Sequence, residues 1–203
     1  MRSIEVYADV MCPFAYVGLR AFDARRRPLG RSAPTLVVRA WPLEIVNGHP
    51  HDGHHLAPEI EALRRDVVPG LFAGFDPDRF PTTTLPALAA TRAACRSSVA
   101  AGDAFALGVR TALFEDGQDV SDPAVLAALA ERFEVPTAAD EDHAAVQADL
   151  EAGRARGVAG SPHWFTSDGD FFCPSLDIHH EGDTWDIRFD PEGFDRFLEA
   201  AFA

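Results

Sequence analysis

The sequence predicts an α/β fold in which a β-α-β unit and a β-β-α unit are separated by a long helical block. Near the start, an alternating apolar segment is followed by helical spacing and a second strand-like segment; residues 58–157 carry apolar positions at helical spacing, and strand patterns return after residue 162. With 203 residues the chain can bury one substantial core. We therefore expect a single domain over residues 1–203, with its core at about 1–45 and 155–203 and an insertion at about 56–154.

The first unit begins with residues 4–10, which alternate as a strand does. From Cys12 to about Arg27 the apolar positions follow helical spacing, and Thr35–Trp41 reads as the second strand. A helix that returns the chain between two strands implies that they are parallel. Residues 47–58 are rich in Gly, Pro and His and predict a loop.

The remaining elements follow from spacing and from turn residues. Asp122-Pro123 is typical of a helix start, and Ser167–Asp170 predicts a turn between two short strands. The expected helices are Leu85–Leu113, Pro123–Phe133, Asp142–Arg156 and the closing amphipathic helix Pro191–Phe202; the expected strands are His163–Thr166, Phe171–Cys173 and a polar hairpin over Asp177–Phe189.

Composition excludes several classes of function. The formal net charge is −14 and every basic side chain is arginine, so neither a lysine Schiff base nor a phosphate-loop lysine can operate. The acidic balance argues against a nucleic-acid partner. No apolar run approaches the ~20 residues of a membrane span, and no signal peptide is visible. We expect a cytoplasmic protein without a membrane partner, whose three cysteines are free thiols; its oligomeric state is left open.

Cys12 is the candidate nucleophile because it falls at the start of the first predicted helix. Pro13 suits the first helical turn, where its missing N–H would have no partner. The free N–H groups of that turn and the helix dipole favour thiolate, and such surroundings can lower a cysteine pKa from ~8.5 to between ~3.5 and ~7.5. The sequence therefore predicts an activated thiol at Cys12.

A resolving cysteine is missing from this motif. Thiol–disulfide exchangers carry a second cysteine three residues after the first, and here that position is Ala15. Cys95 lies in an Ala-rich helical stretch and reads as a buried apolar residue. Cys173 is a candidate resolving thiol, because a turn at Ser167–Asp170 would bring it near residue 164 on the neighbouring strand. A disulfide with Cys12 needs Cα atoms within about 7 Å, and side-chain parity could instead direct Cys173 to the opposite face.

Taken together, the motifs resemble the DsbA-like superfamily of the thioredoxin fold, especially its cytoplasmic branch of FrnE-type oxidoreductases and 2-hydroxychromene-2-carboxylate isomerases. The resemblance rests on Asp9-Val10-Met11-Cys12-Pro13-Phe14-Ala15-Tyr16, Trp41-Pro42-Leu43, the helical stretch through Leu113-Phe114, and Gly157-Val158-Ala159-Gly160-Ser161-Pro162. It implies a thioredoxin-like fold with a helical insertion and a cis Ser161-Pro162 bond beside Cys12. A groove there could bind an extended thiol peptide or glutathione.

The resemblance supplies the remaining site residues and three functional alternatives. Pro13, Phe14, Trp41, Ser161, Pro162 and His163 are the expected substrate-binding residues, with Phe75 as a further candidate apolar wall; for His163 a solvent-facing position is the alternative. The leading expectation is single-cysteine chemistry on thiols, disulfides or glutathione adducts. Glutathione would serve as cosubstrate, and no tightly bound cofactor is expected. The alternatives are a glutathione-dependent isomerase or transferase and a noncatalytic peptide-binding protein.

Histidines gather at positions 49, 51, 54 and 55. Imidazoles beside a carboxylate such as Asp52 can bind zinc, copper or nickel. Glycine and proline surround these histidines, however, and no cysteine is close. We therefore expect an exposed polar loop without a metal site. His179 and His180 belong to the predicted hairpin and have no recognisable partner.

Overall fold

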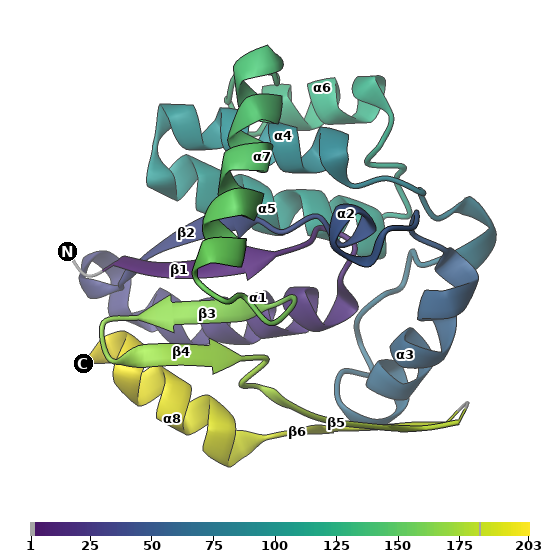
Figure 1. Ribbon diagram of the computed structural model, residues 1–203, viewed down its shortest axis with the longest axis vertical. Helices are drawn as coiled ribbons and strands as arrows, with labels where there is room; N and C mark the ends of the chain where they lie inside the picture. The colour runs from purple at the N-terminus through teal and green to yellow at the C-terminus, as the bar shows by residue number, and fades with distance from the viewer. Residues whose placement is uncertain (1–2, 183) are drawn as a thin grey trace.

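The fold was determined as a computed structural model, which describes residues 3–182 and 184–203. Figure 1 shows a central sheet with helices on both faces and a separate two-stranded ribbon at one end. The strands are β1 (Ser3–Ala8), β2 (Thr35–Ala40), β3 (His163–Thr166), β4 (Gly169–Phe172), β5 (Leu176–Glu181) and β6 (Thr184–Phe189). The helices are α1 (Pro13–Arg26), α2 (Leu43–Asn47), α3 (Gly53–Asp66), α4 (Leu85–Ser97), α5 (Val99–Phe114), α6 (Pro123–Arg132), α7 (Asp140–Ala155) and α8 (Pro191–Phe202), with short 3-10 turns at Arg27–Ser32 and Pro77–Arg79.

The central sheet has the strand order β2-β1-β3-β4. β1 and β2 run parallel and are joined through α1, as the sequence predicts for a β-α-β unit. β3 is antiparallel to β1, with Tyr7 opposite His163, and β4 is antiparallel to β3. The two halves of the fold therefore meet at the β1–β3 pair, which brings the Cys12 loop beside the segment that precedes β3.

Alternation along β1 sends its side chains to two different layers. Ile4, Val6 and Ala8 pack with residues of α1, α5 and α8, whereas Tyr7 packs with Trp41 and Leu150 beneath α7. Figure 1 shows α7 crossing in front of the sheet while α1 and α5 lie behind it. Gly153 permits this crossing, because a Cβ there would lie 2.5 Å from the Trp41 ring. The central strands are thus covered on both faces.

All the helices between β2 and β3 form the insertion, and two sequence predictions need correction there. Residues 47–58 are not one loop: α3 begins at Gly53, with the Asp52 side chain accepting a hydrogen bond from His54 N as its cap. Pro58, the expected start of the helical block, lies inside that helix. The stretch Leu85–Leu113 divides into α4 and α5 at Ser98, whose side chain accepts a hydrogen bond from Ala101 N.

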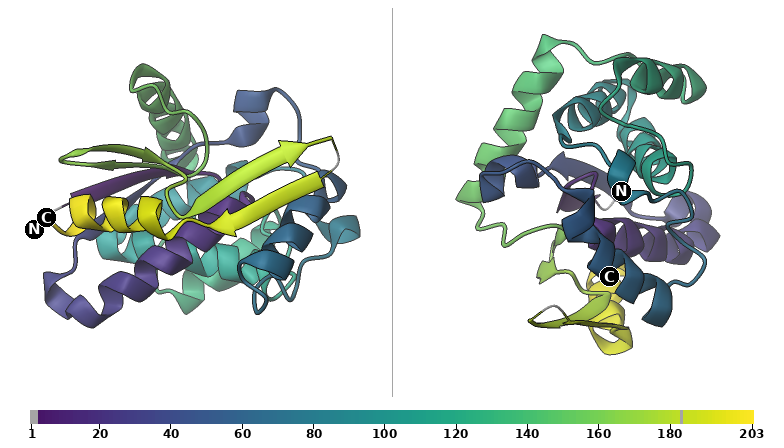
Figure 2. Two further views of the ribbon diagram at one scale, coloured as in Figure 1. Left: turned by 90° about the horizontal axis from the view of Figure 1, so that it is seen from below. Right: turned by 90° about the vertical axis from the view of Figure 1, so that its right-hand side faces the viewer.

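The C-terminal part of the fold follows its prediction closely. The hairpin is formed by β5 and β6, with Leu176 opposite Phe189; residue 183 of the predicted hairpin range lies outside the described residues. Figure 2 shows this hairpin extending beyond the sheet toward α3, against which β6 packs. α8 then begins at Pro191 after its cap Asp190. Within the described chain, no helix combines the length and apolar character needed to cross a membrane.

Candidate active site around Cys12

Cys12 is the N-cap residue of α1, as the sequence predicts. Its Sγ accepts a hydrogen bond from Ala15 N at 3.4 Å and donates one to the Ser161 carbonyl oxygen at 3.1 Å. The Ser161-Pro162 bond is cis, also as expected. Two segments almost 150 residues apart in the sequence therefore meet at one sulfur atom.

Burial determines the protonation state of this thiol. Cys12 is 4% exposed, and this burial, which disfavours the charged thiolate, raises the pKa of Cys12 to about 12. Hydrogen bonding with the Ser161 side chain and with the Ala15 amide opposes the rise, whereas the negative charges of Asp9 and Glu59 add to it. This corrects the prediction of a lowered pKa, because desolvation outweighs the helix-start amides.

Asp9 organises the loop before Cys12 and is fully buried. Its carboxylate accepts hydrogen bonds from Met11 N at 2.9 Å and from Leu43 N at 2.6 Å, and its backbone N–H donates to Ser161 Oγ at 2.9 Å. The carboxylate thus joins the β1–α1 loop to the β2–α2 loop, while the amide joins it to the cis-proline segment. In the sequence Asp9 is visible only as part of the motif, and no local signal indicates this role.

Ser161 is less available than the sequence suggests. Its side chain and carbonyl both bond the Cys12 loop, and the residue is only 8% exposed. A substrate-binding role for the Ser161 backbone needs a free carbonyl, but this carbonyl is already paired with the Cys12 thiol. Any reagent that approaches the sulfur from this side must therefore displace this contact.

Cys173 lies closer to the cis-proline than predicted. His163 is opposite Phe172 and Trp164 is opposite Phe171, so Cys173 falls opposite Pro162 rather than near residue 164. Its N–H donates to the Pro162 carbonyl at 3.0 Å. Burial, followed by the charge of Cys12, raises the pKa of Cys173 to about 12. Cys12, Cys95 and Cys173 are all free thiols.

Phe14 is the expected wall residue that does lie beside Cys12. It packs against the apolar cluster that contains Cys12 and also against the cluster that contains Cys173. Its ring contacts Trp185 of β6, with ring centroids 6.2 Å apart. The hairpin therefore contributes an aromatic residue to this region, which the sequence analysis did not anticipate.

Three other expected residues make their contacts elsewhere. Trp41 is buried against Tyr7 and Leu150 under α7. Phe75 packs against Phe80, in the insertion. His163 is 4% exposed, with Nδ1 accepting a hydrogen bond from Ala159 N and Nε2 lying 2.9 Å from Asp170 Oδ2, so it is not solvent-facing.

The histidine-rich segment is only partly an exposed loop. His49, His51, His54 and His55 line an open pocket of about 670 Å³. His51 is half-buried, and its Nε2 lies 3.5 Å from Asp9 Oδ2. Burial lowers the pKa of His51, but the hydrogen bond and charge of Asp9 outweigh it, so the pKa is raised. Over residues 3–182 and 184–203, no three His, Cys, Asp or Glu side chains converge as metal ligands would.

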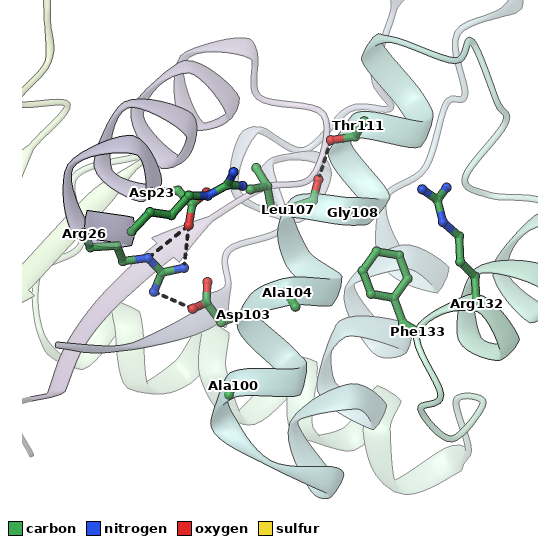
Figure 3. A pocket seen from close by; sticks show the side chains of 11 residues that line it. Asp23, Arg26, Ala100, Asp103, Ala104, Leu107, Gly108, Thr111, Arg132 and Phe133 are labelled. Atoms are coloured by element: carbon green, nitrogen blue, oxygen red, sulfur yellow. Dashed lines mark hydrogen bonds and ion pairs between the residues drawn. The ribbon is translucent and has the colours of Figure 1, made fainter. Parts of the chain in front are cut away.

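A second pocket, of about 360 Å³, lies at the opposite end of α1. Figure 3 shows Arg26 between Asp23 and Asp103 on one side of the pocket, with Phe133 and Arg132 on the other. Arg26 forms ion pairs with both carboxylates, so its charge is compensated within the pocket. Because Asp23 and Arg26 lie in the last turns of α1 and Cys12 precedes its first turn, this pocket is separate from the cysteine site.

A cysteine at the start of the first helix, facing a cis-proline that precedes a strand of a mixed four-stranded sheet, defines a thioredoxin-fold protein. The comparisons agree: the family model for the DSBA-like thioredoxin domain matches residues 3–180, and the chain belongs to that family. No curated protein shows significant sequence similarity to the chain.

Three solved structures share the fold over most of their length. A candidate protein disulfide isomerase from Nitrosomonas europaea is 16% identical, with 98% of each chain covered and a TM-score of 0.64. The cytosolic disulfide reductase DsbM from Pseudomonas aeruginosa, solved with GSH, is 14% identical, with 97% of each chain covered and a TM-score of 0.60. A 2-hydroxychromene-2-carboxylate isomerase is 16% identical, with 84% of this chain and 88% of the other covered and a TM-score of 0.57. At these identities the similarity establishes the fold.

Proposed function

We propose that the protein is a thiol–disulfide oxidoreductase that acts through the single nucleophile Cys12 on disulfides or glutathione adducts. The observation that supports this most directly is the position of Cys12 Sγ between the Ala15 amide and the Ser161 carbonyl beside the cis-proline. The membership of the DSBA-like family adds to it. The free cysteines fit a reducing cytosol, where we place the reaction.

The chemistry needs two exchange steps. The Cys12 thiolate attacks one sulfur of a disulfide, which breaks the S–S bond, releases one half as a thiolate and leaves the other half on Cys12. Because Ala15 replaces the usual second cysteine, an external thiolate such as glutathione then attacks the adduct, forms a new disulfide and returns Cys12 to its thiolate. The helix-start amide of Ala15 would stabilise the thiolate once a substrate has separated Cys12 from the Ser161 carbonyl.

Pro13, Phe14, Ser161 and Pro162 are the residues to which we assign substrate contact, because they adjoin the sulfur in sequence or in space. An extended peptide or glutathione would pair with the backbone of the cis-proline segment, as strand-like ligands do. Trp41 and His163 are engaged in other contacts, and we assign them no contact with substrate.

The test is incubation of the reduced protein with glutathione disulfide, followed by peptide-level mass spectrometry. We expect a glutathione adduct on Cys12 that added glutathione removes. Cys12→Ala should abolish it, whereas Cys95→Ala, which removes a half-buried thiol of α4, should not. Absence of any Cys12 adduct at every pH between 6 and 10 would rule out the proposed chemistry.

A glutathione-dependent isomerase is the second candidate function. The absence of a cysteine at Ala15 and the shared fold of the 2-hydroxychromene-2-carboxylate isomerase favour it. Glutathione-dependent turnover of 2-hydroxychromene-2-carboxylate, lost in Cys12→Ala, would support this class over disulfide exchange. Peptide binding that survives Cys12→Ala, with neither reaction present, would instead indicate a noncatalytic binding protein.

We further propose Cys173 as a resolving thiol that competes with external glutathione. Cys12 Sγ and Cys173 N bond the consecutive carbonyls of Ser161 and Pro162, so both cysteines adjoin the same cis-proline segment. If Cys173 attacks the Cys12 adduct, the products are a Cys12–Cys173 disulfide and free glutathione. Cys173→Ala should then make the Cys12 adduct longer-lived; an unchanged lifetime would leave resolution to external thiols alone.

A further inference from the structure

Arg110 is the one buried cation beside the Cys12 loop, within the part of the chain that the structure describes. It lies on α5 and is fully buried. Its Nη1 donates to the Ala106 carbonyl at 2.6 Å, its Nη2 donates to the Asp9 carbonyl at 2.9 Å, and its Nε has no hydrogen-bond partner. Across residues 3–182 and 184–203, Arg110 has no ion pair, whereas the partly buried Arg26 pairs with two carboxylates.

A guanidinium in this position is costly for the fold. Moving an ion out of water costs several kcal/mol, and the interior compensates for this only with a counter-charge and satisfied hydrogen bonds. Asp9 is the adjacent acid, but its carboxylate accepts hydrogen bonds from Met11 N and Leu43 N, and Arg110 bonds only its carbonyl. Arg110 therefore lacks a direct negative partner in the resting structure.

We propose that the Arg110 guanidinium is the counter-ion of the Cys12 thiolate, holding the anion when the thiol opens to react. Arg110 bonds the backbone of the loop that carries Cys12, three residues before the sulfur. In a medium of low dielectric constant the attraction between two such charges is strong even without direct contact. This role rests on the proposed thiol chemistry and makes Arg110 a positioning residue that acts through Cys12.

The electrostatic relation between these two groups is reciprocal. Burial lowers the pKa of Arg110 to about 10, and the charges of Asp9 and Cys12 oppose that change. The guanidinium stays protonated near neutral pH, where a buried lysine could lose its charge. The thiolate and the protonated guanidinium stabilise each other by the same interaction free energy.

Other charged groups also act on Cys12. Asp9 from the loop after β1 and Glu59 from α3 both raise its pKa, and Cys173 after β4 interacts with its charge. Arg110 from α5 is the cation among these groups. Loss of the Arg110 charge would leave the thiolate facing carboxylates alone. The apparent pKa of Cys12 should therefore be higher in a variant without this charge than in the native protein.

The experiment follows alkylation of Cys12 in the full chain by neutral iodoacetamide between pH 7 and 10, with Cys12 read separately by peptide mass spectrometry. Arg110→Met removes the charge and the hydrogen bonds. Arg110→Gln removes the charge but keeps an amide that can donate to the Asp9 carbonyl. Arg26→Met is the matched control, since it removes an arginine that is mostly buried but lies at the far end of α1. Circular dichroism and thermal unfolding establish which variants are folded.

We expect both Arg110 variants to slow Cys12 alkylation about tenfold at every pH, which corresponds to a rise of about one unit in its apparent pKa. Arg26→Met should stay within about twofold of the native rate. A native rate in a folded Arg110→Gln or Arg110→Met variant, or equal slowing by Arg26→Met, would overturn the role of Arg110. If native Cys12 forms the glutathione adduct while the Arg110 variants react normally, only this inference fails; if native Cys12 forms no adduct, the proposed function itself fails.

Discussion

At the scale of single residues, Cys12 is held in a closed and neutral state. Its thiol donates a hydrogen bond to the Ser161 carbonyl, and only 4% of the residue is exposed to solvent. A neutral thiol attacks disulfides poorly, since the thiolate is the nucleophile. Under the proposed function, a substrate would replace the Ser161 contact, and the Ala15 amide would then stabilise Cys12 as a thiolate.

The first prediction concerns the pH dependence of Cys12 alkylation in the native protein. Since burial raises the pKa of Cys12 to about 12, the rate should still be rising at pH 10. Stopped or quenched alkylation with Cys12→Ala as the control measures it. A plateau below pH 8 would show that the helix-start amides prevail over burial.

The second prediction concerns Glu59, whose pKa burial raises from 4.5 to about 7. The folded state favours the neutral carboxyl, so ionisation costs stability as pH rises from about 4.5 through 7. Glu59→Gln removes that cost. We expect the variant to match the native protein at pH 4 and to exceed its unfolding free energy by about 3 kcal/mol at pH 8.

Urea unfolding at the two pH values measures this difference. Glu61→Gln, on an exposed position of the same helix, is the control and should change little at either pH. A Glu59→Gln variant that gains no stability at pH 8 would mean that Glu59 is hydrated or paired when ionised. Removal of the Glu59 charge should also speed Cys12 alkylation above pH 7, since that charge raises the pKa of Cys12.

At the scale of elements, the caps that the sequence contains define where the helices begin. Asp52, Asp122 and Asp190 each accept a backbone hydrogen bond at the start of α3, α6 and α8. Asp122-Pro123 and Asp190-Pro191 are readable from sequence because proline follows the cap directly. The Asp52 cap is followed by Gly53 and two histidines, which hid the start of α3.

The third prediction tests one of these caps. Asp190→Ala removes the carboxylate that accepts a hydrogen bond from Gly193 N at 2.9 Å, and α8 carries Phe194 and Phe197 into the core. We expect a loss of about 1 kcal/mol in the unfolding free energy. Chemical denaturation should show no comparable loss for Asp195→Ala, an exposed acid of the same helix. Equal losses would indicate a general effect of charge on α8 rather than capping.

At the scale of the whole molecule, the insertion and the sheet share their packing. α7 covers Tyr7 and Trp41, and Asp149 of α7 accepts a hydrogen bond from Ala40 N at 3.0 Å. The buried Arg110 of α5 reaches the Cys12 loop from the other face. The insertion thus supports the loop that carries the nucleophile, in addition to covering the sheet.

The fourth prediction tests the docking of α7. A Cβ at Gly153 would lie 2.5 Å from the Trp41 ring and 2.9 Å from the Tyr7 ring, so Gly153→Ala must displace an aromatic side chain or the helix. We expect a loss of about 1–3 kcal/mol. Gly70→Ala, where the added Cβ meets nothing within 4 Å, is the matched control in the same denaturation series. A stable Gly153→Ala variant would show that the α7 interface is loosely packed.

The sequence by itself determined the order of the strands, the placement of Cys12 at a helix start and the family resemblance. These depend on local signals: alternation in β1 and β2, helical spacing, and prolines at Pro13, Pro123 and Pro191. The cis-proline came from the resemblance, not from a local signal. Only the tertiary structure decided that Trp41 lies under α7 and that Cys173 falls opposite Pro162. It also decided that Arg110 donates a hydrogen bond to the Asp9 carbonyl in the Cys12 loop.

The same distinction explains the Cys12 pKa. A helix start is a local feature that favours the thiolate, and the sequence shows it. Desolvation depends on what the rest of the chain places over the sulfur, including Ser161 and the cluster around Phe14. Because burial sums contacts between segments far apart in the sequence, it could reverse the direction expected from the local motif.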